Sequence, residues 1–134
     1  MKQKFSLKWK ASKQPRKQRK YRARAPLHLK YKMLAAHLSK DLIKKYKKRS
    51  MPLRKGDNIK VARGTFKGKQ GRISTVNTKK TIVYIEGIQK TRKDGTKVNM
   101  PFHPSNLIIT ELNLEDKKRI KKLNKNIKED KKGN

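Results

Sequence analysis

The sequence contains no cysteine, few aromatic residues and very little negative charge. Without cysteine, the chain has no disulfide framework, no thiol nucleophile and no cysteine-based zinc site. Aromatic residues make up 6% and hydrophobic residues 32% of the 134 positions, so any hydrophobic core must be small and confined to part of the chain. The longest stretch without a formal charge, residues 98–110, contains two prolines and is too short to span a bilayer. The N-terminal residues form no apolar signal-peptide segment, so we expect an intracellular protein without a membrane span.

The charge that is present is overwhelmingly positive. Lysine and arginine number 41 against 9 acidic residues, which gives a formal net charge of +32 at pH 7. So large an excess of one sign opposes compact folding through self-repulsion, whereas a polyphosphate partner converts it into binding free energy by releasing counterions. A merely solvated surface usually mixes the two signs. The composition therefore predicts a nucleic acid as the partner.

Charge and apolar residues divide the chain into three parts. Residues 1–50 hold 19 lysine and arginine residues and a single acid, whereas apolar β-formers cluster over residues 51–112. The first part lacks enough apolar surface to offset the entropy lost on ordering. We therefore expect a basic arm over residues 1–37 that becomes ordered on its partner, a folded domain over residues 38–112, and a basic C-terminal helix and tail over residues 113–134.

Alternation of apolar and polar residues and runs of β-branched residues predict five short strands in the middle part. These strands contain Ile59 and Val61, Ile73 and Val76, Thr81 to Ile85, Val98 to Phe102, and Leu107 to Ile109. A one-residue slip between Ile73 and Val76 indicates a bulge, and Asp94-Gly95 indicates a two-residue hairpin turn. About sixty residues of closely spaced strands predict a mainly β fold, a small closed barrel of the SH3-like type.

Helices are expected only beside this domain. Ser39 is a suitable N-cap for a short helix over residues 40–48, and Asn113 is a suitable N-cap for a second helix that runs through Leu123. Each predicted helix carries apolar residues at helical spacing, which would face the barrel. These residues are Leu42, Ile43, Tyr46, Ile120, Leu123 and Ile127.

The glycine-rich loop, RGTFKGKQGR over residues 63–72, lies between the first two predicted strands and combines three glycines with four cations. Glycine permits a positive φ and the close approach of a ligand to the backbone, and the surrounding cations suit a phosphate. An ordinary glycine-rich hairpin loop is the alternative interpretation. The loop also approaches a P-loop, but only three residues separate Gly64 from Gly68, and a strand rather than a helix follows. The sequence therefore favours a loop that binds a phosphate backbone and rejects nucleotide hydrolysis.

A resemblance to a known family begins at residues 55–76, KGDNIKVARGTFKGKQGRISTV. This run resembles the KOW motif, which is found both in ribosomal proteins and in NusG-type transcription elongation factors. The flanks are similar to the archaeal and eukaryotic form of universal large-subunit ribosomal protein twenty-four, called twenty-six in the eukaryotic numbering. The similar flanking runs are KQPRKQRKYRARAPLHLKYKML (13–34), LSKDLIKKYKKRSMPLRKGD (38–57) and HPSNLIITELNLEDKKR (103–119).

The resemblance covers roughly residues 13–123 and carries the expected function with it. It implies an SH3-like barrel, direct binding to large-subunit ribosomal RNA, an early role in subunit assembly, and a place near the polypeptide exit tunnel of the cytoplasmic ribosome. The implied partners are that RNA and neighbouring large-subunit proteins, with no membrane and no small-molecule substrate. Residues 1–12 precede the usual start of the family pattern, so Trp9 inherits no role. The short C-terminal tail is closer to the archaeal than to the eukaryotic form.

The residues expected to bind RNA lie in the basic arm, in the glycine-rich loop and at two histidines within family-like segments. Cations and backbone amides position a protein on phosphates but do not recognise the identity of the base. They are Lys13, Arg16, Lys17, Arg19, Lys20, Arg22, Arg24, His28, Lys30, Arg63, Gly64, Lys67, Gly68, Lys69, Gly71, Arg72 and His103.

Two other classes of function account for less of the sequence. A NusG-type elongation factor, or another RNA-binding protein with a KOW motif, would explain the loop but not the flanks, and the former would add an α/β domain for which the chain has no room. An enzyme would need polar groups that converge in an apolar pocket. Asp57 and Glu86 are expected to form salt bridges, since so positive a field keeps both carboxylates ionised. We therefore predict no catalytic residue and no cofactor.

The histidines and aromatic residues carry weaker signals. The three histidines lack the paired spacing of a metal site, so we predict no metal ion; they are His28, His37 and His103. Four aromatic residues alternate with cations in the arm, where they could stack on unpaired bases or equally pack against the barrel or an RNA groove. These are Phe5, Trp9, Tyr21 and Tyr31.

Overall fold

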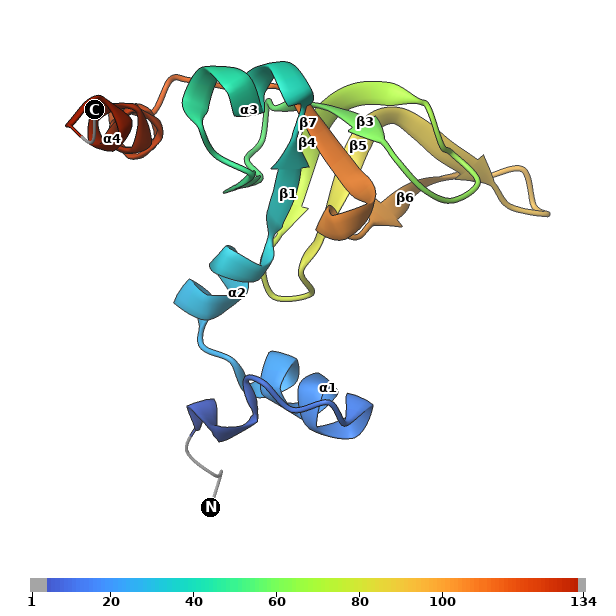
Figure 1. Cartoon of the computed structure of the whole chain (residues 1–134). Coiled ribbons are helices and arrows are strands. Elements are labelled where there is room, and N and C mark those ends of the chain that lie inside the picture. The colour runs from blue at the N-terminus through green and yellow to red at the C-terminus, as the bar shows by residue number, and fades with distance from the viewer. Residues whose placement is uncertain (1–4, 133–134) are drawn as a thin grey trace.

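The computed structural model describes the backbone of residues 5–132 and the side chains of residues 5–125. It contains one sheet, with helices before it, beside it and after it (Figure 1). The strands are β1 (Ala35–Leu38), β2 (Ser50–Pro52), β3 (Asn58–Val61), β4 (Gln70–Asn77), β5 (Ile82–Thr91), β6 (Lys97–Phe102) and β7 (Leu107–Glu111). The helices are α1 (Pro15–Arg24), α2 (Leu27–Met33), α3 (Lys40–Tyr46) and α4 (Lys117–Lys132), with short 3-10 turns η1 (Leu7–Trp9) and η2 (Pro104–Asn106).

The sheet has seven strands in the order β2-β1-β7-β3-β4-β5-β6. Neighbouring strands pair antiparallel except β1 and β7, which run parallel with His37 opposite Ile108. The order starts at β2 and ends at β6, and these two strands do not pair with each other. The mainly β class predicted from the sequence is therefore confirmed, but the closed barrel is not.

All five predicted strands are present, as β3 to β7. The pairing of β4 with β5 shifts register between Ile73 and Thr75, so the predicted bulge is confirmed. The hairpin at Asp94-Gly95 is also present, but its loop is longer than two residues, because the Arg92 amide donates to the Thr96 carbonyl at 2.8 Å. The sequence analysis missed β1 and β2, which pair with each other at the edge of the sheet.

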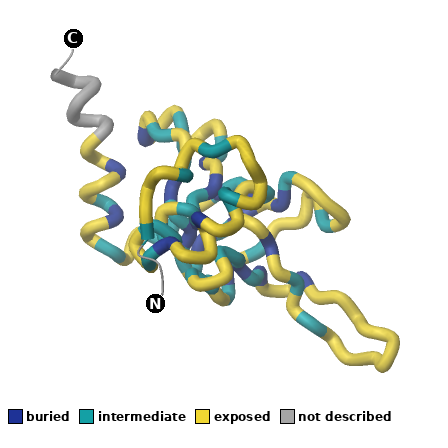
Figure 2. Tube along the Cα trace, turned by 90° about the horizontal axis from the view of Figure 1, so that it is seen from below, coloured by how far each residue is buried: buried dark blue, intermediate teal, exposed yellow. Residues whose placement is uncertain are grey.

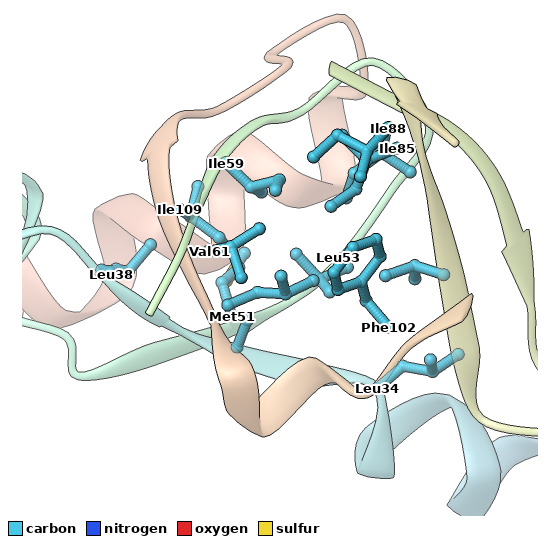
Figure 3. Close-up of a cluster of buried hydrophobic side chains, with 14 of the residues drawn as sticks. Leu34, Leu38, Met51, Leu53, Ile59, Val61, Ile85, Ile88, Phe102 and Ile109 are labelled. Atoms are coloured by element: carbon cyan, nitrogen blue, oxygen red, sulfur yellow. The ribbon is translucent and has the colours of Figure 1, made fainter. Parts of the chain in front are cut away.

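One apolar cluster fills the concave side of the sheet (Figure 3). Its fully buried members come from nearly every strand and from the segment between α2 and β1, where Leu34 is 0% exposed. Complete burial of a side chain of this size contributes about 1.5–3 kcal/mol. The largest members are Leu34, Leu38, Met51, Leu53, Ile59, Ile73, Ile85, Leu107, Ile109 and Leu123.

Helix α3 begins where the sequence predicts. The Ser39 hydroxyl accepts a hydrogen bond from the Leu42 amide at 3.4 Å, as an N-cap does. The helix ends at Tyr46 because Lys47 adopts a left-handed conformation with φ of 50°. The prediction that its apolar residues face the sheet is confirmed, since Tyr46 is buried and Leu42 and Ile43 pack against the core.

Helix α4 begins later than predicted and continues further. The Asn113 side chain accepts from the Glu115 amide and makes a local turn, whereas Asp116 accepts from the Lys118 amide at 2.8 Å and takes the capping role. The prediction of Asn113 as the N-cap is therefore wrong, and α4 runs from Lys117 to Lys132. Leu123 is 1% exposed and belongs to the core, while Ile127 lies outside the described side chains.

The arm before the sheet contains helices that the sequence analysis did not predict. Helices α1 and α2 follow each other below the sheet and lead into β1 (Figure 1). Pro15 opens α1, where its missing amide proton costs nothing. The expectation that this arm becomes ordered only on its partner stays a prediction.

Candidate nucleic-acid interface

The glycine-rich loop connects β3 to β4 as a closed hairpin. At its base the Val61 amide donates to the Lys69 carbonyl at 2.9 Å, and the Gly68 amide donates to the Val61 carbonyl at 2.8 Å. A tight turn within it is closed by the Lys67 amide, which donates to the Gly64 carbonyl at 3.0 Å. The loop is therefore ordered by its own backbone, and its cations are carried on a fixed frame.

An aromatic side chain fastens the loop to the core. Phe66 is half-buried, and its ring lies edge-on to Phe102 with 5.9 Å between centroids, a contact worth about 0.5–1.5 kcal/mol beyond the area it buries. The ammonium group of Lys69 lies 5.1 Å from the centroid of the same ring. Phe66 thus holds the loop down while the loop's charged residues remain exposed, namely Arg63, Lys67, Lys69 and Arg72.

The three loop glycines play different parts. Gly64 and Gly68 have φ of +93° and +86°, and no heavy atom lies within 4 Å of where a Cβ would stand. The space beside their Cα atoms is thus open to the close approach of a ligand, as the sequence predicts for a phosphate-binding loop. Gly71 lies in β4, and a Cβ there would meet Ile85 Cγ2 at 2.6 Å. The packing of β4 on β5 therefore explains Gly71, which does not share the positive φ that the sequence suggested.

The loop adjoins the segment that carries His103. The Ala62 amide at the start of the loop donates to the Asn106 carbonyl at 2.8 Å, and Asn106 closes the η2 turn that His103 caps. His103 Nδ1 lies 2.7 Å from the Ser105 hydroxyl, which leaves Nε2 as the ring nitrogen for an outside partner. Two predicted site regions that are far apart in sequence are thus neighbours in the fold.

The arm also approaches His103. Partial burial lowers the pKa of His103 from its usual value of 6.5, and the positive charge of Arg22 in α1 lowers it further. Arg22 must therefore lie close enough for its charge to act on the imidazole. The η2 turn is thus linked to the glycine-rich loop through the Ala62 hydrogen bond and to the arm through the charge of Arg22.

Most of the predicted arm residues are exposed, as a phosphate contact requires. Lys17 and Lys30 are half-buried, and the Lys30 ammonium donates to the Ala23 carbonyl at 3.3 Å, which ties α2 to α1. His28 is exposed in α2. The other exposed members are Lys13, Arg16, Arg19, Lys20, Arg22 and Arg24.

Two further groups of cations were not predicted from the sequence. The outer end of the hairpin of β5 and β6 projects from the sheet, and its residues 89–97 are all exposed (Figures 1 and 2). Its outer end carries Lys90, Arg92, Lys93 and Lys97. Asp94 accepts from the amide and the hydroxyl of Thr96 and so shapes the tip. The Asp94-Gly95 pair predicted the position of this hairpin. Its cations were not recognised as a group, because the sequence did not predict the full length of β5.

The second group lies between α3 and α4. Burial lowers the pKa of Lys48, and the charge of Lys122 in α4 lowers it further. The two ammonium groups repel each other, so an anion nearby would be stabilised. Charge density alone does not reveal this pair, because the two residues are far apart in the sequence.

The two acidic residues expected to form salt bridges within the barrel differ in the fold. The Asp57 carboxylate is 0% exposed and is bound by Arg119, which is 4% exposed, so Asp57 does form a salt bridge, but its partner lies in α4 and not within the barrel. Glu86 is exposed in β5 and makes no ion pair with the described residues, so its salt bridge was predicted wrongly. Among the described residues, no group of three or more histidine or acidic side chains is arranged to hold a metal ion. None of the described helices is long and apolar enough to cross a membrane.

Comparison with known proteins gives consistent results. The sequence pattern of the family described as the eukaryotic L26 and archaeal L24 ribosomal proteins matches residues 12–126. The large ribosomal subunit protein uL24 of Methanosphaera stadtmanae is 43% identical over 116 residues, which cover 87% of this chain and 99% of that protein. The protein of the same name from Methanothrix thermoacetophila is 48% identical over 110 residues, which cover 82% of this chain and 95% of that protein.

Proposed function

Because the chain belongs to the family of the eukaryotic L26 and archaeal L24 ribosomal proteins, we propose that it binds ribosomal RNA of the large subunit directly. The family is a structural class without enzymatic activity, so the chain is a structural ribosomal protein and not an enzyme. Membership also agrees with the expected location on the cytoplasmic ribosome.

One arrangement carries the proposal of direct RNA binding. The glycine-rich loop is fixed to the η2 turn, and His103 at the start of that turn feels the charge of Arg22 in α1. The space at the Cβ positions of Gly64 and Gly68 is open, and the surrounding side chains are cationic. Such a surface suits a phosphate backbone, which accepts hydrogen bonds from amides and ion pairs from lysine and arginine.

We propose that the RNA-binding surface consists of the glycine-rich loop and the η2 turn together with the arm. Its residues are those expected from the sequence, over residues 13–30 and 63–72 and at His103, with Gly71 acting through packing. The outer end of the β5–β6 hairpin adds a second contact. Strands β3 to β7 correspond in this proposal to the KOW unit of SH3-like type, and residues 38–112 to the folded domain. Binding occurs early in subunit assembly and near the exit tunnel, beside other large-subunit proteins.

A NusG-type elongation factor is less well supported. That interpretation rests on the glycine-rich loop, whereas the family pattern extends over residues 12–126 and so includes the arm and much of α4. The described chain has one sheet, and the arm that precedes it is helical. A NusG-type α/β domain has no counterpart among these elements.

Sedimentation of cell extracts tests the proposal. We expect the tagged full-length chain to travel with large subunits through a sucrose gradient at moderate salt, because many phosphate contacts act together, and to be released as the salt concentration rises. Crosslinking in the same cells should recover large-subunit ribosomal RNA. Recovery with RNA polymerase and nascent transcripts, and not with the subunit, would overturn the proposal in favour of an elongation factor.

A further inference from the structure

A short segment that precedes the family pattern folds back onto α1. The family match begins at residue 12, so Phe5 to Lys10 lie outside it. Gln18 of α1 holds this segment, because its side-chain amide nitrogen lies 2.7 Å from the Ser12 carbonyl, 3.1 Å from that of Lys10 and 3.2 Å from that of Trp9. The segment is therefore attached to the arm through its backbone.

A cavity of about 270 Å³ lies between this segment and α1. Three aromatic rings line it, and those of Phe5 and Tyr21 are in tilted contact with 5.2 Å between centroids. Tyr21 is buried, whereas Trp9 is half-buried and its ring borders the cavity. Ligand cavities are usually about 300–1,000 Å³, so this one suits a small flat group and not a large ligand.

The rim of the cavity is cationic. Lys8, Lys20 and Arg24 line it beside the rings, and the Lys20 ammonium lies 5.4 Å from the centroid of the Trp9 ring. Aromatic walls accept a flat ring by stacking, and cations at the edge accept an adjacent negative charge. An aliphatic chain would not use the cations, and an acidic peptide would not use the three rings. A nucleotide uses both features, because its base is flat and its phosphate lies at the edge.

We infer that this cavity binds one unpaired nucleotide of an RNA strand, with the base against Trp9 and the phosphate at Lys8 and Lys20. The inference rests on the proposed RNA binding and adds a contact that the phosphate-directed surface lacks, since a stacking cavity selects unpaired over paired nucleotides. A base within a duplex is stacked on both faces and cannot enter the cavity. The segment before the family pattern thereby directs the arm to a bulge, a loop or a strand end.

The fluorescence of Trp9 can report binding at the cavity, because Trp9 is the only tryptophan in the sequence. The full-length protein is titrated with a short oligoadenylate strand and, separately, with a blunt-ended RNA duplex of equal length. Labelled-RNA anisotropy reports total binding, and tryptophan fluorescence reports contact at the cavity. We expect both RNAs to bind, and the single strand alone to quench Trp9 in a saturable manner that follows its anisotropy.

A matched pair of variants separates the cavity from general charge. Lys8→Gln and Lys10→Gln each remove one positive charge from the same short segment, but only Lys8 lines the cavity. Lys8→Gln should weaken the binding that quenches Trp9 several-fold more than Lys10→Gln does, while duplex binding falls equally in both. Phe5→Leu removes a ring and should weaken single-strand binding about tenfold, as expected for the loss of one stacking contact. Tyr21→Leu repeats this test from α1, and circular dichroism shows whether the arm remains helical.

The outcomes distinguish the inference from the function on which it rests. If both RNAs bind but Trp9 is unaffected, or if Lys8→Gln and Lys10→Gln behave alike, the cavity inference fails while RNA binding stands. If neither RNA binds, the proposed function fails. Quenching by adenosine monophosphate at the same concentration as the strand would overturn the strand as the ligand and assign the cavity to free nucleotides.

Discussion

Asp57 and Arg119 form a buried bidentate ion pair across 62 positions of the sequence, with contacts of 2.6 and 2.7 Å. Asp57 also accepts from the Arg54 and Asn113 amides, and Arg119 also donates to the Asn113 and Pro52 carbonyls. Every buried side-chain nitrogen and oxygen among the described residues has a partner. The pair fastens α4 to the sheet. Arg119 therefore stabilises the fold and does not bind a ligand, although the chain is extremely basic.

We expect Arg119→Met to destabilise the protein by about 3–5 kcal/mol, because it leaves the Asp57 carboxylate buried without its counter-charge. Methionine has a similar length, so lost packing contributes little to the effect. Lys118→Met is the matched control, since Lys118 is the exposed neighbour in α4 and its substitution should change stability by less than about 0.5 kcal/mol. Urea unfolding measures both. Equal midpoints for the two variants would mean that the ion pair contributes nothing in solution.

The loop glycines allow fold and binding to be separated. Gly71→Ala should destabilise the sheet by about 1–3 kcal/mol, because its Cβ would meet the buried Ile85 side chain at 2.6 Å and the Glu86 carbonyl at 3.0 Å. Gly68→Val meets no neighbour, so its cost of about 1–3 kcal/mol arises from the positive φ alone.

The two glycine variants should differ more clearly in RNA affinity, measured on protein shown by circular dichroism to be folded. Gly68→Val should weaken binding because a branched side chain fills the open space at Gly68 and blocks the close approach of a phosphate to the loop, whereas folded Gly71→Ala should bind normally. The opposite order of affinities would remove Gly68 from the interface.

Local patterns predicted the parts of the fold that local chemistry determines. Strands β3, β4 and β6 follow from alternation, β7 follows from a short apolar run, and α3 follows from the Ser39 cap. Strand β1 was missed because Ala-Ala-His-Leu has no strand pattern of its own and is extended only by pairing with β2 and β7. The extent of β5 was missed because Glu86-Gly87 interrupts its apolar run, although Gly87, with φ of +76°, only bends the strand there.

The candidate site was likewise predictable only where local residue types determine it. Charge and glycine spacing identified the loop and the arm, because phosphate binding requires those residue types wherever they occur. The contact of the Ala62 amide with Asn106 and the effect of Arg22 on His103 depend on the fold, as does the approach of Lys48 to Lys122. The prediction of Asn113 as the N-cap was wrong for a related reason. The backbone amide of Asn113 donates to the Asp57 carboxylate, and this contact depends on the fold.

The two central loop lysines should contribute separately to the salt dependence of RNA binding. If some 6 to 10 phosphates are neutralised, the slope of log K against log salt should be about −5 to −8 for the unchanged protein. Lys67→Ala and Lys69→Ala should each make this slope shallower by up to about one unit with little change in thermal stability. The Lys69 change should also loosen Phe66, over whose ring its ammonium lies. A wild-type slope shallower than about −2 would contradict phosphate-dominated binding.

The pH dependence of binding should reveal whether His103 meets a phosphate. Its pKa in the free protein lies below the usual value of 6.5, because burial and then Arg22 oppose the charged form. Between that lowered pKa and 6.5 the unfolded chain binds more protons, so the His103 contribution to stability is lost as the pH falls through this interval. A phosphate beside Nε2 would raise the pKa again, so RNA binding would take up a proton and affinity should increase as the pH falls through the same interval. NMR titration of the imidazole with and without an RNA fragment measures both pKa values.

Three variants complete this test. His103→Gln should remove the increase in affinity at lower pH, and Arg22→Gln should raise the pKa of His103 in the free protein because it removes a repelling charge. His37→Gln is the control, since His37 accepts from the Arg49 side chain at 2.9 Å and lies outside the proposed interface. It should leave the pH dependence intact. An affinity for RNA that is the same at pH values on both sides of the His103 pKa would show that no phosphate lies beside the ring, and His103 would then only cap the η2 turn.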